Sequence, residues 1–134
     1  MSKGYTAHRE RSELVNAFGK TLGKRASFRC EWCDGTDDLR VWDYRPKAEP
    51  TLASLALLCA SCRNMAEGKP ADERRLHSLR NALWSDVPAI SEGAARVLVR
   101  SSMPWIREAI EESLIDESVK RELLGLIIAS SVRR

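Results

Sequence analysis

The chain has 134 residues, of which 43% are hydrophobic and 31% charged, and its formal net charge is +3. This composition is typical of a globular domain and argues against a largely disordered chain. The N-terminus lacks the apolar run of a signal peptide, and the longest apolar block, residues 123–129, is too short to cross a bilayer of about 30 Å. We therefore expect a cytoplasmic protein with reduced cysteines and no membrane segment.

The charge is unevenly distributed along the chain. Residues 1–29 hold seven Lys or Arg against two Glu, a difference of +5, whereas residues 81–134 hold seven against eight acidic residues, a difference of −1. A basic head on a nearly neutral body indicates an anionic partner.

The first predicted element is a helix over residues 8–25, which belongs to a basic N-terminal segment placed at residues 1–25. Its apolar residues recur at helical spacing: Leu14, Val15, Phe18 and Leu22. Gly19 and Gly23 each lower the helix propensity by about 1 kcal/mol, so this helix depends on tertiary packing. Its other face is basic and either contacts phosphates or is simply solvated: Arg9, Arg11, Lys20, Lys24 and Arg25.

All the cysteines form two Cys-x-x-Cys pairs separated by residues 34–58: Cys30 with Cys33, and Cys59 with Cys62. Each pair directs two thiolates from one tight turn, and together they supply the sulfurs of a closed tetrahedral zinc site, at about 2.3 Å from the ion. The alternatives are two disulfides or four unrelated buried thiols. The paired spacing, and the lack of any sign of an oxidising compartment, favour one structural zinc ion.

The sequence around the cysteines predicts a small β-hairpin and a helix. Asp34-Gly35 is a turn signal after the first pair. Residues 39–44 alternate as a strand does, residues 52–58 form a second apolar strand, and a helix follows over about residues 59–67. The predicted fold class is α+β, with a treble-clef Cys₄ zinc domain (knuckle, β-hairpin, helix) at residues 26–70.

Residues 71–134 are predicted to form three to four helices packed on the zinc domain. Candidate N-caps precede each apolar stripe: Asp72, Ser85 or Asp86, Ser102 and Asp116. We expect Trp84 and Trp105 to be buried between these helices. The last helix is apolar on nearly every face, through Leu123, Leu124, Leu126, Ile127 and Ile128, so it is either wrapped by its neighbours or pairs with another chain.

The cysteine pairs and the strand between them resemble the frame of HNH nucleases, which cut a phosphodiester with a histidine base and a divalent metal. The resemblance rests on residues 29–35, 39–41 and 57–62. The positions that carry catalysis in such enzymes hold other residues in this chain: Trp42, Asp43, Ser54 and Arg63. The resemblance therefore implies a frame retained without its chemistry.

A second resemblance covers more of the chain, about residues 22–117. Val41-Trp42-Asp43-Tyr44, the second cysteine pair and the run Leu83-Trp84-Ser85-Asp86-Val87-Pro88-Ala89 are similar to the N-terminal region of PhnA-like proteins. This implies a zinc frame joined to a helical stretch. Longer members of that family end in a small β-barrel, and no comparable sequence occurs here.

These observations favour a non-catalytic zinc-binding module whose basic head binds nucleic acid. The residues expected to contact it are Lys20, Lys24, Arg25, Arg29 and Arg45. Trp32 and Trp42 either stack on bases or cover the zinc knuckle. One alternative is a protein partner or a homodimer formed through residues 119–129. The other is a divergent metal-dependent nuclease acting around Asp43.

Overall fold

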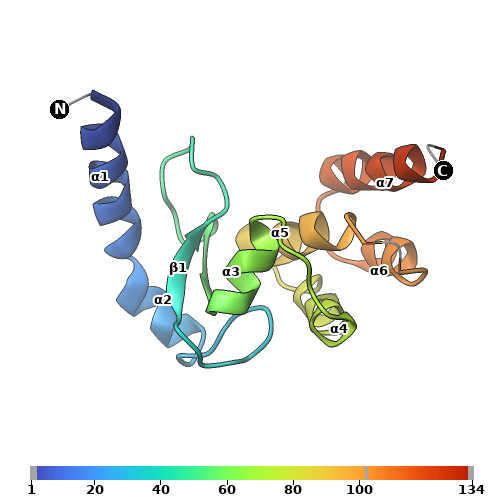
Figure 1. Cartoon of the computed structure of the whole chain (residues 1–134), viewed down its shortest axis with the longest axis horizontal. Helices are drawn as coiled ribbons and strands as arrows, with labels where there is room; N and C mark the ends of the chain where they lie inside the picture. Colours follow the sequence, from blue (N-terminus) through green and yellow to red (C-terminus); the bar gives the residue numbers. More distant parts are fainter. Residues whose placement is uncertain (1–2, 102, 133–134) are drawn as a thin grey trace.

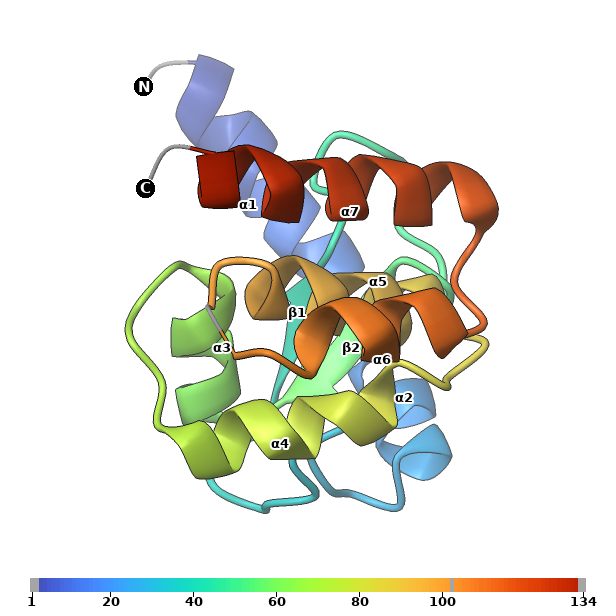
Figure 2. The ribbon, with the colours of Figure 1, turned by 90° about the vertical axis from the view of Figure 1, so that its right-hand side faces the viewer.

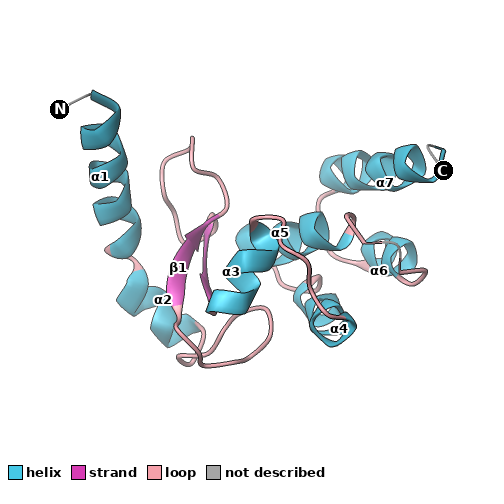
Figure 3. Ribbon diagram, viewed as in Figure 1, coloured by secondary structure: helices cyan, strands magenta, loops and turns pink. Residues whose placement is uncertain are grey.

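The computed structural model describes residues 3–101 and 103–132, with side chains described for residues 9–101 and 103–127. The fold is mixed α+β, with a two-stranded hairpin between an N-terminal helical segment and a group of C-terminal helices (Figures 1 and 3). In chain order the elements are α1 (Lys3–Asn16), α2 (Gly19–Arg25), β1 (Arg40–Asp43), β2 (Leu55–Leu58), α3 (Ala60–Ala66), α4 (Glu73–Ala82), α5 (Pro88–Leu98), α6 (Ile106–Glu112) and α7 (Glu117–Val132).

The antiparallel hairpin lies at the centre of the molecule and is covered on both faces (Figure 1). Successive side chains of a strand point to opposite faces. Leu55 and Leu57 join a small core with α1 and α2, whereas Ala56 and Leu58 join a large core with the C-terminal helices. This two-sided burial explains why β2 is a continuous apolar run rather than an alternating one.

The second strand is shorter than the predicted range of residues 52–58. Residues 52–54 form a turn instead, in which Thr51 and Ser54 bond each other: the Thr51 amide donates to Ser54 Oγ at 3.0 Å, and the Ser54 amide donates to the Thr51 carbonyl at 3.1 Å. Such local side-chain bonds compete with the strand ladder.

The helix predicted over residues 8–25 is two helices, interrupted at Ala17 and Phe18. At the interruption the Phe18 amide bonds the Val15 carbonyl, three residues back, in place of the usual four. The change of direction lets Val15 of α1 and Leu22 of α2 both reach the small core. Figure 1 shows α1 extending from the hairpin away from the rest of the molecule.

The large core joins the cysteines to the C-terminal helices. In the view turned by 90° about the vertical axis, α4 and α6 lie in front of the hairpin, and α7 lies above α5 and α6 (Figure 2). The fully buried side chains there include Leu58, Leu79, Leu83, Leu98, Ile110 and Leu123. No helix within the described ranges is both long and apolar enough to cross a bilayer.

Two of the predicted caps are confirmed. The Asp72 side chain accepts from the Arg75 amide at 2.9 Å at the start of α4, and the Asp116 side chain accepts from the Ser118 amide at 3.0 Å at the start of α7. In α5 the N-cap is Val87, whose amide donates to Ser85 Oγ at 3.1 Å. The predicted cap Ser102 lies outside the described residues.

The prediction that Trp84 is buried is wrong, because 49% of its surface is exposed. The helix α4 ends at Ala82, and Trp84 lies in the following turn, where its amide bonds the Asn81 carbonyl. It therefore leaves the apolar stripe of the helix. Trp105 is half-buried beside the core, with its ring stacked on His77 at 4.9 Å.

Candidate metal centre and basic surface

Three elements bring the cysteines together. Cys30 and Cys33 lie in the turn before the hairpin, Cys59 is the residue between β2 and α3, and Cys62 lies in the first turn of α3. The four Sγ atoms all lie within 4.8 Å of one another. Among the described residues this is the one group of three or more His, Cys, Asp or Glu side chains placed to hold a metal ion.

The separation of the sulfurs fits a tetrahedral zinc ion. Zinc–sulfur bonds of about 2.3 Å place the ligands of a regular tetrahedron about 3.8 Å apart. Cys33 Sγ and Cys59 Sγ are 3.5 Å apart, and all four cysteines are free thiols. A disulfide would hold its sulfurs at about 2.05 Å, so the alternative of two disulfides does not describe this cluster.

The surroundings of Cys30 favour the thiolate that a metal requires. Hydrogen bonding from the neighbouring Cys62 thiol, assisted by the amides of Cys33, Cys59 and Trp32, outweighs burial and lowers the pKa of Cys30 below its usual range. The same hydrogen bond, together with burial, raises the pKa of Cys62. Cationic zinc would replace the shared proton and stabilise all the thiolates.

The turn after the first cysteine pair packs closely against the cysteine sulfurs. The Cys30 amide bonds the Gly35 carbonyl at 2.7 Å, and the Asp34 amide bonds the Cys30 carbonyl at 2.9 Å. Asp34 has a φ of 68°, and a Cβ added at Gly35 would lie 3.3 Å from Cys33 Sγ. The turn predicted at Asp34-Gly35 is therefore confirmed, with glycine at the point of closest contact.

Arg75 is a contributor to this site that the sequence alone does not reveal. Its guanidinium Nη1 lies 3.8 Å from Cys33 Sγ. Partial burial opposes its charge, but negative charge on the nearby cysteine cluster, from Cys33 above all, raises its pKa. It thus offsets part of the negative charge of a four-thiolate centre. Arg75 lies on α4, 42 positions from Cys33 in the sequence, and no sequence pattern marks this contact.

The two tryptophans near the cysteines cover the interior instead of offering free faces. Trp32 is buried, and its Nε1 donates to the Ile90 carbonyl at 3.1 Å. The rings of Trp32 and Trp42 are 5.1 Å apart, and both lie against Gly93 of α5, where an added Cβ would meet Trp42 at 2.8 Å and Trp32 at 3.0 Å. Covering the knuckle is therefore the alternative that the structure supports.

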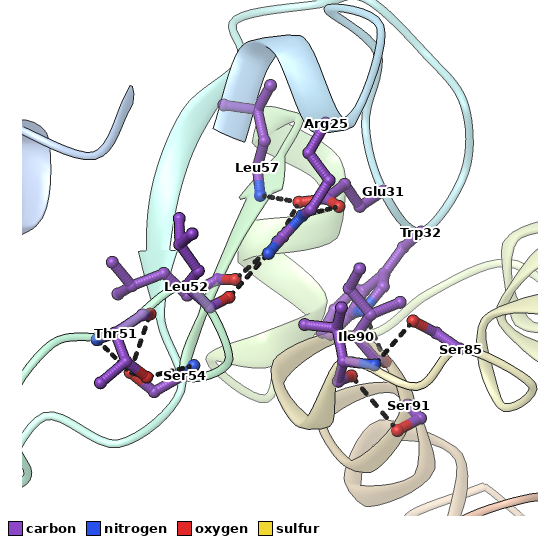
Figure 4. A network of polar contacts seen from close by, with 12 residues as sticks. Arg25, Glu31, Trp32, Thr51, Leu52, Ser54, Leu57, Ser85, Ile90 and Ser91 are labelled. Carbon is purple, nitrogen blue, oxygen red and sulfur yellow. Dashed lines mark hydrogen bonds and ion pairs between the residues drawn. The ribbon is translucent and has the colours of Figure 1, made fainter. Parts of the chain in front are cut away.

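The five basic residues expected to contact nucleic acid differ in their surroundings. Arg25 is engaged internally: it donates to both carboxylate oxygens of Glu31, at 2.9 and 2.7 Å, and to the carbonyls of Leu52 and Leu55 (Figure 4). Arg45 Nη2 lies 3.3 Å from the buried carboxylate of Glu92. Arg25 therefore joins α2 to the hairpin, whereas Arg45 makes its ion pair with about half of its side chain exposed.

The other three basic residues are exposed and are not held by a buried carboxylate within the part of the chain that the structure describes. Arg29 lies 3.9 Å from Asp34, with more than half of its side chain exposed. Lys20 and Lys24 are exposed on α2 and form no salt bridge with any residue in the described ranges. They are one helical turn apart and so share a face of α2.

The positions that correspond to HNH catalysis are engaged in packing and ion pairs. Asp43 bonds Arg11 of α1, with Oδ2 2.9 Å from Nη2, and its buried Oδ1 has no hydrogen-bond partner among the described residues. Arg63 pairs with Asp38 at 2.8 Å. Ser54 belongs to the turn with Thr51, and Trp42 packs on the large core.

The proposed partner surface, residues 119–129, is only partly described. Leu123 is fully buried, and Val119, Leu124 and Ile127 pack against the large core. Leu126 is 49% exposed. The side chains from Ile128 onward lie outside the described residues, so pairing with another chain stays a prediction.

Comparison with family models, with curated proteins and with solved structures gave no match in any of the three. The resemblances to HNH nucleases and to PhnA-like proteins therefore remain predictions from sequence. The metal centre is assigned on its geometry alone, as a Cys₄ cluster consistent with zinc.

Proposed function

We propose that this chain is a non-catalytic zinc-binding module of the treble-clef type that binds nucleic acid through the exposed face of α2. In this proposal one zinc ion is held by Cys30, Cys33, Cys59 and Cys62, and its role is structural. Four sulfur ligands fill a tetrahedral zinc ion, so no position is left for water or substrate. When bound, the ion supplies folding free energy.

The absence of catalysis in this proposal is supported by the residues at the HNH-like positions. A nuclease of that type needs a base and metal ligands that are free to reach a phosphodiester. Here Asp43 and Arg63 are held by Arg11 and Asp38, respectively. The frame therefore fits a degenerate HNH or PhnA-like zinc region that positions a surface.

The observation that carries nucleic-acid binding is the pair Lys20 and Lys24. Both are exposed on one face of α2 without an acidic partner in the described ranges, and Arg29 lies just beyond the same helix. Unpaired cations on one face attract phosphates and release counterions when they bind them. Arg25 and Arg45 contribute by holding α2 and the hairpin loop in place.

A salt titration tests this proposal. The zinc-loaded full chain is titrated with short single-stranded and duplex DNA over a series of salt concentrations. We expect binding to weaken as salt rises, and Lys20→Gln or Lys24→Gln to reduce the salt slope by about 0.7 for single strands or 0.9 for duplex. Lys69→Gln, which removes an exposed lysine on the loop after α3, is the matched control and should leave the slope unchanged. Binding that is absent, or insensitive to salt, would refute the proposal.

A second candidate function is a protein partner or homodimer on residues 119–129, favoured by the exposed Leu126. It predicts that sedimentation detects a self-associated species or a complex, and that Leu126→Asp removes it without unfolding the chain. A wild-type chain that stays monomeric at high concentration would exclude the homodimer.

A further inference from the structure

The end of α2 places an aromatic side chain on the basic surface. The Phe28 amide donates to the Gly23 carbonyl at 2.8 Å, and the Ser27 amide donates to the Lys24 carbonyl at 3.3 Å. This pair of bonds is a Schellman motif, in which the residue after the cap adopts a left-handed conformation. Ser27 has a φ of 54°, as the motif requires, and Phe28 has a φ of 56° as well.

The second left-handed residue is unusual, because a bulky side chain rarely adopts positive φ. The motif needs that conformation at Ser27 only. Phe28 is nevertheless held there with 62% of its surface exposed. Backbone strain of this kind concentrates at functional sites.

The Phe28 ring packs against Gly23. A Cβ added at Gly23 would come within 2.5 Å of the ring, so the aromatic side chain lies directly on the helix backbone. A Schellman motif often includes an apolar contact at this place. Here the partner is a glycine, so the contact fixes the ring position while much of the residue remains in solvent.

A groove runs beside this ring, between α2 and the hairpin. Its volume is about 440 Å³. It is lined by Asn16, Gly19, Gly23 and Phe28 on the α2 side and by Leu39, Arg40, Val41 and Leu57 on the hairpin side. Its volume falls in the range of small-molecule sites. Its lining combines apolar side chains with the polar groups of Asn16 and Arg40. The two glycines leave the helix wall without side chains.

The charges around the groove decide which occupant fits. Lys20 and Lys24 directly follow Gly19 and Gly23 in sequence, so the two lysines lie along α2 next to the two glycines. Arg29 directly follows Phe28. A groove of mixed polar and apolar lining, with an exposed ring and nearby cations, matches a flat aromatic group attached to a phosphate chain. Proteins that bind single-stranded nucleic acid combine such aromatic platforms with basic surfaces.

We propose that this groove binds a base of single-stranded nucleic acid, stacked on Phe28, with the neighbouring phosphates on Lys20 and Lys24. This inference rests on the proposed function and specifies its ligand as single-stranded. Bases within a duplex are stacked on one another, so they cannot lie on a protein ring without leaving the helix. Stacking tolerates any base, so binding should depend weakly on sequence.

Phe28→Leu is the direct test, because leucine keeps an apolar contact on Gly23 but removes the aromatic face. The zinc-loaded full chain is titrated with oligothymidylate and with a duplex of equal length. We expect Phe28→Leu to weaken single-strand binding by roughly tenfold and to leave the salt slope unchanged. Phe28→Tyr should retain the wild-type affinity. Trp84→Leu, which removes an exposed aromatic residue outside this groove, is the matched control and should change nothing.

The outcomes separate this inference from the proposed function. If the wild-type chain binds both nucleic acids with salt dependence but Phe28→Leu has no effect, the stacking site is wrong and the basic surface stands. If the wild-type chain binds neither, both proposals fail. A preference of the wild-type chain for duplex over single strand would overturn the stacking site even if Phe28→Leu failed to fold.

Discussion

The two faces of the hairpin have different roles. On one face, Ala56 and Leu58 pack with the cysteines and the C-terminal helices in the large core. On the other, Leu55 and Leu57 pack with Val15 and Leu22 in a core of few residues. The large core is joined to the metal centre, whereas the small core supports the helix that carries the exposed lysines. A metal ion bound by the cysteines would therefore stabilise a hairpin whose opposite face supports α2.

The largest effect should come from loss of a metal ligand on the large-core side. Cys62 is fully buried within the cluster. Zinc binding in small structural sites contributes about 10–16 kcal/mol, so Cys62→Ala should lose the metal and abolish cooperative thermal unfolding. Metal analysis and circular dichroism check this. Retention of zinc and of the wild-type Tm would show that the large core does not depend on the ion.

Adjacent residues of β2 compare the two cores directly. Leu58→Ala, at a fully buried position facing the large core, should cost about 3–4 kcal/mol. Leu57→Ala, facing the small core and slightly exposed, should cost about 2–3 kcal/mol. Denaturant unfolding measures both. Only Leu58→Ala should also make the protein easier to strip of zinc with a chelator, and equal chelator sensitivity would contradict the division into two cores.

The ion pair between Arg25 and Glu31 joins α2 to the turn of the first cysteine pair. The Glu31 side chain is 6% exposed and also accepts from the Leu57 amide at 2.9 Å. Glu31→Gln leaves Arg25 without its carboxylate and should lower the free energy of unfolding by about 2 kcal/mol. The exposed pair of Arg9 and Glu13 is the control, since Glu13→Gln should cost less than about 0.5 kcal/mol. Similar losses in the two variants would show that the internal pair is no more than a surface contact.

The smallest effect concerns the cap of α7, far from the hairpin. Hydrogen bonds from the Ser118 side chain and amide lower the pKa of Asp116 below its usual 3.8. The unfolded chain therefore binds this proton more readily, so the stabilisation is present above about pH 4 and is lost as the pH falls through the lowered pKa. Asp116→Asn keeps a good cap and should leave stability at neutral pH nearly unchanged while reducing its loss in acid. Thermal melts over a pH series check this, and an unchanged acid response would exclude a role for Asp116.

The sequence predicted the features whose signals are local. The spacing of the cysteines, the hairpin between them and the caps at Asp72 and Asp116 depend on neighbouring residues. The ion pair between Arg25 and Glu31 was not predicted. The sequence pattern of a basic residue on a helix is the same whether its side chain contacts water or a distant carboxylate. The break at Phe18 and the exposure of Phe28 were missed for a related reason. The break depends on packing against the hairpin, and the exposure of Phe28 depends on the geometry of the helix end. Neither feature produces a periodic pattern in the sequence.

The most direct test of this account is X-ray absorption spectroscopy at the zinc edge, combined with metal analysis of the purified chain. The account predicts one zinc ion per chain with four sulfur ligands at about 2.3 Å. A chain without zinc, or a zinc ion with nitrogen or oxygen among its ligands, would contradict a closed Cys₄ centre as the basis of this fold.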